Sequence, residues 1–241
     1  MLNFANTNVG KVRKMNQDYY YISEDGFLNV LADGMGGYTG GEIASKLATI
    51  SAVDYIEKHF NKNKDYEKEE ILEIIKNAME YANTEVFHKA KAQEELEQMG
   101  TTLEICLIYK DRAFIGHIGD SRIYRIRKGI MRKLTKDHSY VQTLVEDGTI
   151  TKEEAEHHPK KNMLMKALGC EEKVSADIMV KGFLKDDIIL ICSDGLTNMV
   201  PEERIHSIIE DDLEGATHRL INEANENGGL DNITLIIINN N

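Results

Sequence analysis

The feature that most constrains this fold is a run of short apolar segments separated by tight turns. Four of them follow one another with two residues between neighbours: 102–109, 112–118, 121–127 and 130–134. A connection this short can join antiparallel strands, whereas parallel strands need a crossover of a dozen or more residues. The sequence therefore predicts an antiparallel sheet, with Lys128-Gly129 as one of its turns.

Further strands and two pairs of helices complete the predicted layers. The other strand-like segments are 19–23, 28–33, 176–182, 187–193 and 232–238, and an Asp25-Gly26 turn joins the first two. Apolar residues at helical spacing predict helices along 43–60, 71–90, 201–210 and 212–227. Antiparallel strands with paired outer helices define an α+β fold. Because no linker or repeat divides residues 1–241, we expect a single domain.

A polar stretch interrupts the strands between residues 137 and 162. Its pattern predicts two short helices, the second beginning with a Thr151–Glu154 capping box. We expect this segment to lie on the surface, outside the sheets.

Charge and cysteine usage exclude several classes of protein. A net charge of −12 argues against binding to nucleic acid or anionic membranes, which require basic patches. The three cysteines, Cys106, Cys170 and Cys192, form no CxxC pair, as is common in a reducing compartment. No apolar run approaches the roughly 20 residues that span a bilayer, and the N-terminus lacks a signal-peptide core. We expect a cytoplasmic protein without membrane insertion.

The stretch NVLADGMGGYTGGEIASKL at 29–47 places Asp33 between an apolar run and five glycines. Asp33 could be a turn residue, part of a phosphate cradle, or a ligand for a cation. A cradle does not fit, because Thr39 stands where GxGxxG needs a glycine and Glu42 where a P-loop needs lysine. A turn is the ordinary role of Asp-Gly, yet the run before Asp33 predicts a buried strand.

Other aspartates share this position at the edge of an apolar strand. They are Asp18, Asp120, Asp194 and Asp231. A carboxylate carried to the end of a buried strand is costly unless it is paired or bound to a cation. Because histidine and cysteine are scarce near these residues, the set indicates an oxygen-ligand site for Mg²⁺ or Mn²⁺ rather than for zinc.

Motifs in a fixed order make the chemistry more specific. The chain resembles the bacterial type-2C metal-dependent serine/threonine protein phosphatases, the PPM family, over about residues 3–238. The motifs are GKVRKMNQD, ADGMGGYTGGEIA, GTTLEICLI, GHIGDSRIYRI, LTKDHSYVQTLVEDGTIT, LICSDGLTNMV and GGLDNITLIII. The resemblance implies an α-β-β-α sandwich of two antiparallel sheets flanked by helix pairs, with a small helical flap near 140–165.

The resemblance also implies two or three Mn²⁺ or Mg²⁺ ions at one end of the sheets. Asp33 would bridge two ions, and the Gly34 carbonyl would bind one of them. Asp194 and Asp231 would complete the coordination of the other. Asp120 would help to hold a third ion.

Residues around the ligands have implied roles as well. Asp18 would hold metal-bound waters, with Gln17 and Asn232 close behind the ligands. Arg13 would grip the substrate phosphate. Without the resemblance, Arg13 would be interpreted as solvated charge within the sequence KVRK.

Three positions depart from the family pattern. Many members have Glu at the position of Gln17, and many have His at that of Tyr38 or Met35. We therefore assume no histidine proton donor and expect a metal-bound water to protonate the leaving group. The sequence predicts His117 and His138 to be structural residues rather than ligands.

The implied activity is hydrolysis of phosphoserine and phosphothreonine in proteins by a metal-bridging hydroxide. This mechanism requires no protein nucleophile. Cys106 and Cys192 would be poor candidates for one, because neither lies in a loop rich in hydrogen-bond donors. One alternative is a catalytically inactive phosphopeptide-binding scaffold on the same fold, which would have lost metal aspartates. A cation-binding module without catalysis would not account for Arg13. We expect a monomer whose partners are phosphoproteins, the substrates of a serine/threonine kinase.

Overall fold

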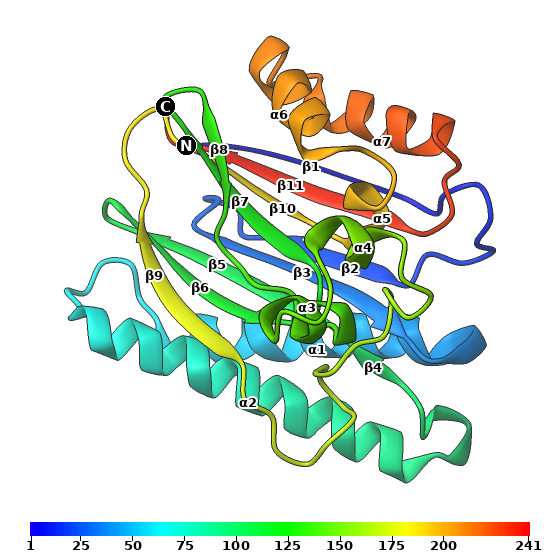
Figure 1. Ribbon diagram of the computed structural model, residues 1–241. Helices are drawn as coiled ribbons and strands as arrows, with labels where there is room; N and C mark the ends of the chain where they lie inside the picture. Colours follow the sequence, from blue (N-terminus) through cyan, green and yellow to red (C-terminus); the bar gives the residue numbers. More distant parts are fainter.

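Two antiparallel sheets lie face to face, and each carries a pair of helices on its outer side (Figure 1). The computed structural model describes residues 1–241, except for the side chains of residues 37–39. The first sheet has the strand order β1 (Leu2–Asn8), β11 (Ile233–Asn239), β10 (Ile188–Cys192), β7 (Arg122–Arg127) and β8 (Ile130–Lys133). The second has the order β2 (Asp18–Ile22), β3 (Leu28–Met35), β5 (Leu103–Tyr109), β6 (Arg112–Ile118) and β9 (Asp177–Gly182), and β4 (Gly100–Thr101) pairs with β3. This arrangement confirms the predicted α+β sandwich. It corrects one prediction, because the four successive strands between 102 and 134 do not form a single sheet: β5 and β6 lie in the second sheet, and β7 and β8 lie in the first.

The turns between neighbouring strands explain why the pairing is antiparallel. Lys128 and Gly129 join β7 to β8 with φ angles of 52° and 68°. Two positive φ angles are what a type I′ hairpin turn requires. Gly26, with a φ of 75°, lies between β2 and β3 in the predicted Asp25-Gly26 turn.

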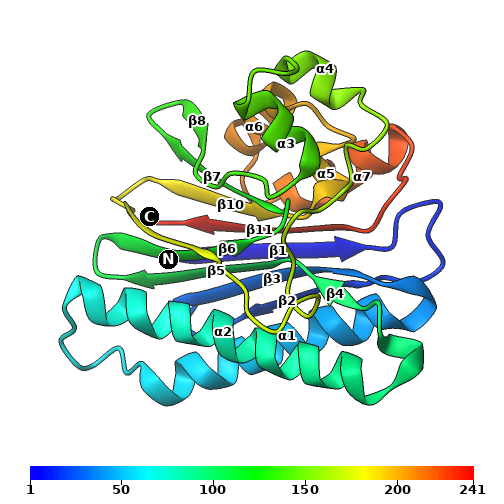
Figure 2. The ribbon, with the colours of Figure 1, turned by 60° about the horizontal axis from the view of Figure 1, so that its bottom comes forward.

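The outer helices cover one sheet each, as Figure 2 shows. The longer ones are α1 (Gly37–His59), α2 (Lys68–Ala92), α6 (Glu202–Asp211) and α7 (Ala216–Glu226). The shorter ones are η1 (Glu94–Leu96), α3 (Tyr140–Glu146), α4 (Lys152–Glu156) and α5 (Asp194–Thr197). Helices α1 and α2 pack on the second sheet, and α6 and α7 on the first. No described helix is both long and apolar enough to cross a bilayer.

Three apolar layers fix the sheets relative to each other and to the helices. The layer between the sheets includes Leu31, Ile115, Ile191 and Ile236, all fully buried. Burying one such side chain contributes roughly 1.5–3 kcal/mol relative to leaving it exposed. A close-packed interior of this kind holds the strand ends in place, and the strand ends carry the candidate site.

The polar stretch after β8 forms α3 and α4, which lie outside the two sheets (Figure 2). The predicted capping box is confirmed, because Thr151 Oγ1 accepts from the Glu154 N–H and Glu154 Oε2 accepts from the Thr151 N–H. The base of the stretch is tied by a bridge between Ser139 and Leu164. Its division from the rest as a flap subdomain near 140–165 stays a prediction.

Several elements were absent from the sequence interpretation or began elsewhere, among them the short η1 and β4. β1 was not predicted, because LNFANTN alternates too many amides with its apolar residues and forms an edge strand paired only to β11. α1 begins at Gly37, inside the glycine loop, where helix propensity is lowest. The short helix α5, which Asp194 opens, has no periodic pattern to reveal it.

Candidate metal centre and active site

The antiparallel topology brings the five candidate aspartates to one end of the sandwich. Asp33 lies near the end of β3, Asp120 follows β6, and Asp194 follows β10. Asp18 begins β2 and Asp231 precedes β11. Because neighbouring strands run in opposite directions, the start of one lies beside the end of the next. Asp18 and Asp33 accordingly stand directly opposite each other in the β2–β3 register.

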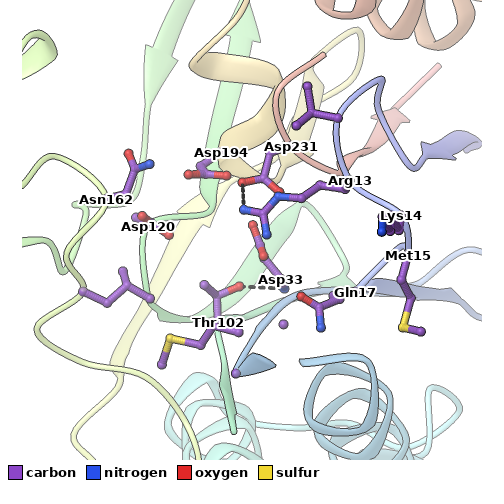
Figure 3. Close-up of a pocket in the computed structure, with 15 residues that line it drawn as sticks. Arg13, Lys14, Met15, Gln17, Asp33, Thr102, Asp120, Asn162, Asp194 and Asp231 are labelled. Atoms are coloured by element: carbon purple, nitrogen blue, oxygen red, sulfur yellow. Dashed lines mark hydrogen bonds and ion pairs between the residues drawn. The ribbon is translucent and has the colours of Figure 1, made fainter. Parts of the chain in front are cut away.

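A cavity of about 490 Å³ opens at this end of the sheets (Figure 3). It is lined by seven of the predicted site residues, Arg13, Gln17, Asp33, Gly34, Asp120, Asp194 and Asp231. The other lining residues come from the loop before β2, from the β3–α1 junction, from Thr102 and from the segment after α4. Asp18 and Asn232, which are buried, lie behind this wall.

The buried carboxylates of the site raise one another's pKa values. Burial raises the pKa of Asp33 well above its usual range, and repulsion from Asp18, Asp194, Asp120 and Asp231 adds to the effect. Burial likewise raises the pKa of Asp18 to about 7 and that of Asp194 to about 6. The pKa of Asp120 is well above normal for the same reason, with repulsion from Asp194. Such a cluster favours a cation that would restore the ionised forms.

The donor set fits hard divalent cations. Asp18 Oδ1 is buried without a hydrogen-bond partner, although Asp18 Oδ2 accepts from Ser193 Oγ at 2.9 Å. Among the described residues, no three His, Cys, Asp or Glu side chains already converge as a ligand set for one ion. Mg²⁺ keeps several waters and uses only one or two carboxylates, so it does not need such a set.

Gly34 lies where the backbone of β3 meets the first turns of α1. A Cβ atom at Gly34 would stand 2.0 Å from the carbonyl oxygen of Gly41 and 2.6 Å from that of Gln17. Only glycine allows this contact, which explains part of the glycine loop. The loop is therefore built for close packing beside the cavity, and not as a phosphate cradle.

Arg13 reaches the carboxylates from the loop before β2. Its Nη2 lies 2.8 Å from Asp231 Oδ2, and both side chains are partly exposed (Figure 3). The predicted phosphate-gripping residue therefore contacts a predicted metal ligand. A phosphate or a cation that enters the cavity would compete for one member of this pair.

Amide groups hold this loop in place. The Asn232 side chain accepts from the Gln17 N–H at 2.8 Å and donates to the carbonyls of Val9 and Met15 at 2.9 and 3.0 Å. The Gln17 carbonyl accepts from Gly34 N–H and from Ser45 Oγ. Asn232 and the Gln17 backbone therefore position the loop that carries Arg13.

Sequence reasoning missed several residues that orient the carboxylates. The Thr102 hydroxyl accepts from the Asp33 N–H at 2.9 Å and lies 3.0 Å from Ser121 Oγ. Asn198, one turn after Asp194, donates to Asp194 Oδ2 at 2.9 Å. Thr102 lies in the GTTLE motif and Asn198 is four residues beyond an aspartate on a helix, so a signal was present for both.

The histidines agree with their predicted structural role. His117 Nδ1 lies 2.7 Å from Glu104 Oε1, and His117 Nε2 lies 2.7 Å from the Lys136 carbonyl, in a fully buried pair. His138 stacks on His117, and its Nδ1 accepts from the Gly119 N–H. Met35 lines the cavity. The side chain of Tyr38 lies outside the described residues.

The cavity gathers carboxylates of a kind that suits divalent cations, and the sequence relatives identify the family. The protein phosphatase 2C family profile matches residues 10–229. The serine/threonine phosphatase stp of Listeria innocua is 37% identical over 98% of this chain and 94% of its own length. Protein phosphatase PhpP of Streptococcus pneumoniae is 38% identical over 98% and 96%. The chain belongs to the protein phosphatase 2C family.

Solved structures agree with this assignment. The serine/threonine phosphatase PstP/Ppp of Mycobacterium tuberculosis has a TM-score of 0.88 at 34% identity, covering 98% of this chain and 97% of that one. The PstP catalytic domain in complex with two manganese ions has a TM-score of 0.86 at 34% identity, covering 98% and 96%. The chain is a metal-dependent protein serine/threonine phosphatase, and Mn²⁺ or Mg²⁺ is its cofactor.

Proposed function

We propose that the cavity at the strand ends is the centre where this chain hydrolyses phosphoserine and phosphothreonine. The observation that carries the proposal is the convergence of Asp33, Asp120, Asp194 and Asp231 on one cavity that Arg13 also reaches. Divalent cations held there would supply a water of lowered pKa and would offset charge on the phosphoryl oxygens.

The aspartates of the cavity would have different roles in metal binding. Asp33 lies at the centre, within the influence of all the others, and is placed to bridge two ions. The Gly34 carbonyl is adjacent to Asp33, and Asp194 and Asp231 form the opposite wall (Figure 3). Asp120, which also lines the cavity, would help to hold a third ion. Asp18, behind them, would receive hydrogen bonds from waters through its unpartnered Oδ1.

Arg13 is the residue placed to bind the phosphoryl group. Its guanidinium is half-exposed and is held at the cavity by a single ion pair with Asp231. A guanidinium can bind two phosphoryl oxygens in parallel, and it offsets the charge that builds up on them during transfer. Gln17 and Asn232 contribute by fixing the loop.

Among the side chains that the structure describes at the cavity, none is suited to act as a covalent nucleophile. Burial raises the pKa of the Cys106 thiol to about 12, and burial raises that of Cys192 further. Both cysteines lie in apolar layers rather than in the cavity. Direct attack by water is therefore the route that this chain supports, with a water as proton donor to the leaving group.

The inactive-scaffold alternative gains no support from the site. A scaffold would tolerate loss of the aspartates, whereas all five are present and arranged together. A simple cation-binding module would not need Arg13 at the cavity.

Partners and cellular location extend the same proposal. Phosphoproteins are the substrates, and a serine/threonine kinase that phosphorylates them would be the opposing enzyme in a bacterial signalling pathway. A cytoplasmic monomer that binds neither nucleic acid nor membrane fits the free thiols of Cys106, Cys170 and Cys192 and the net charge of −12.

The test is hydrolysis of an aryl phosphate and of phosphoserine and phosphothreonine peptides with Mn²⁺. We expect activity that a chelator abolishes and added Mn²⁺ restores. Rapid acid quench during turnover should recover no phosphorylated protein. A trapped phosphoenzyme would contradict direct attack by water, and metal-independent hydrolysis would contradict the assigned centre.

A further inference from the structure

Two loops beside the cavity are positively charged, whereas the molecule as a whole is negatively charged. Residues 10–17 carry Lys11, Arg13 and Lys14 and no acidic residue, in a chain of net charge −12. Residues 157–170 carry Lys160, Lys161 and Lys166 and again no acidic residue. We refer to these two segments together as the basic rim.

The basic rim faces the cavity from both sides. Lys14 lines the cavity on one side, and Asn162, next to Lys161, lines it on the other (Figure 3). All the lysines of the rim are exposed. Among the described residues, Lys11, Lys14 and Lys161 form no ion pair within the chain, so each is free to contact a ligand.

The distribution of charge within the flap shows that the rim is not simply a solvated face. Helix α4 carries Lys152 and three glutamates, Glu153, Glu154 and Glu156, whereas the loop that returns to the cavity carries lysines and no acidic residue. The rim therefore places positive charge around an opening whose floor is acidic. Positive charge at that distance from the carboxylates is suited to a ligand that brings its own negative charges.

Apolar side chains accompany the lysines at the opening. Val12 and Met15 line the cavity with 60% and 38% of their surface exposed. Leu164 lines it from the opposite loop. A polypeptide that follows the phosphorylated residue across the opening would cover these side chains.

We propose that the basic rim selects phosphoproteins in which aspartate or glutamate flanks the phosphorylated serine or threonine, with an apolar residue against Val12 and Met15. The inference rests on the proposed function and deepens it. Arg13 and the metals bind the phosphoryl group itself, whereas Lys14 and Lys161 contact the neighbouring acidic side chains. The phosphatase would therefore distinguish its substrates by the charge of the residues that flank the phosphorylated serine or threonine.

The test compares three phosphothreonine peptides that differ only in the two residues on each side of the phosphothreonine. These four residues are all glutamate in the first peptide, all glutamine in the second and all lysine in the third. At low salt we expect kcat/KM to fall in that order, by about 2- to 5-fold per reversed contact, as for exposed charge pairs. The glutamate-to-glutamine ratio should shrink as ionic strength rises. Lys14→Gln and Lys161→Gln should each bring this ratio closer to 1.

Lys76→Gln is the matched control, because Lys76 lies on the remote outer helix α2. It should keep the wild-type ratio. Equal or reversed preference in the wild type, or a ratio that neither rim variant changes, would overturn the proposal. If neither the peptides nor an aryl phosphate is hydrolysed, the proposed function is contradicted, but the basic rim can still be tested. Calorimetry then measures whether the glutamate-flanked peptide binds more tightly than the glutamine-flanked and lysine-flanked peptides.

Discussion

The chain buries carboxylates in two regions and treats them in opposite ways. In the sheet interior, Glu104 of β5 stands directly opposite His117 of β6 and forms a buried pair with it. At the strand ends, the charges that act most strongly on Asp33 are all carboxylates. Glu104 is fully buried beside its protein partner, whereas the four aspartates that line the cavity are partly exposed, and Arg13 pairs with one of them, Asp231.

A buried carboxylate that pairs with a protein cation has a structural role, whereas carboxylates that face one another indicate a binding site for a cation. Burial disfavours the protonated ring of His117, but the Glu104 carboxylate outweighs burial and raises the pKa of His117 to about 9. On Glu104 burial is the larger effect and raises its pKa to about 7, although His117 opposes the rise. Asp137 follows the same rule, because Arg122 and Lys133 hold its pKa below the ordinary value despite burial. At the cavity Arg13 pairs with Asp231, but the charges that act on Asp33 are carboxylates, and a cation from outside the chain would offset them.

The largest effect is expected for Glu104→Gln. This change leaves His117 buried without its carboxylate, and breaking a buried pair costs about 3–5 kcal/mol of folding free energy. Urea unfolding at pH 7 measures it. A loss below about 1 kcal/mol would show that the pair is not what stabilises this part of the sheet.

Arg13→Ala should weaken substrate use much more than metal binding. Loss of a charge-assisted contact to phosphate should reduce transition-state binding by about 1.5–3 kcal/mol, measured as kcat/KM. Affinity for Mn²⁺, measured by calorimetry, should be unchanged or higher, because Arg13 no longer competes for Asp231. If kcat/KM in this variant equals that of the wild type, Arg13 does not contact the phosphate and is only a charged surface residue.

Stability should fall as pH rises from about 6.5 through 9. The folded protein holds a proton on His117 more tightly than the unfolded chain does, since the folded pKa is about 9 against an ordinary 6.5. The stabilisation is therefore complete below about 6.5 and lost above about 9, by on the order of 2 kcal/mol. Unfolding free energies across this range test the sign, and Glu104→Gln should flatten the slope.

Asp120→Ala should keep the fold and the two principal metal sites but lower turnover roughly tenfold, as when a supporting metal contact is removed. A Mn²⁺ titration by calorimetry beside steady-state kinetics measures both effects. Identical stoichiometry and kcat in variant and wild type would remove Asp120 from the centre.

The sequence predicted the layers of the fold because short connections leave few choices. β5 and β6 are joined by a two-residue turn and pair antiparallel as predicted, and so do β7 and β8. The same prediction is wrong for β6 and β7, because the short connection between them carries the chain from one sheet to the other. The edge strand β1 escaped notice because an edge strand needs little apolar surface. The start of α1 escaped because glycines are chosen there for close packing and not for helix propensity.

The aspartates of the site were predictable from charge at the ends of buried strands, together with the order of the motifs. The contacts that orient them were not. The ion pair of Arg13 with Asp231 and the clamp formed by Asn232 join residues more than 200 positions apart. Such contacts follow from the three-dimensional arrangement, and no local pattern reports them. The basic rim was likewise hidden by a net charge of the opposite sign.

The most direct test of the central claim is the thermal unfolding of wild type and Asp33→Asn, each with chelator and with millimolar Mn²⁺. With chelator, removing a carboxylate that four other aspartates repel should leave stability unchanged or raise it by about 1 kcal/mol at an effective dielectric near 20. With Mn²⁺, the variant should gain much less stability than the wild type, because a ligand stabilises a fold according to its affinity. If the variant instead loses stability equally in both conditions and keeps the wild-type response to Mn²⁺, Asp33 is a structural residue and the account of the site is wrong.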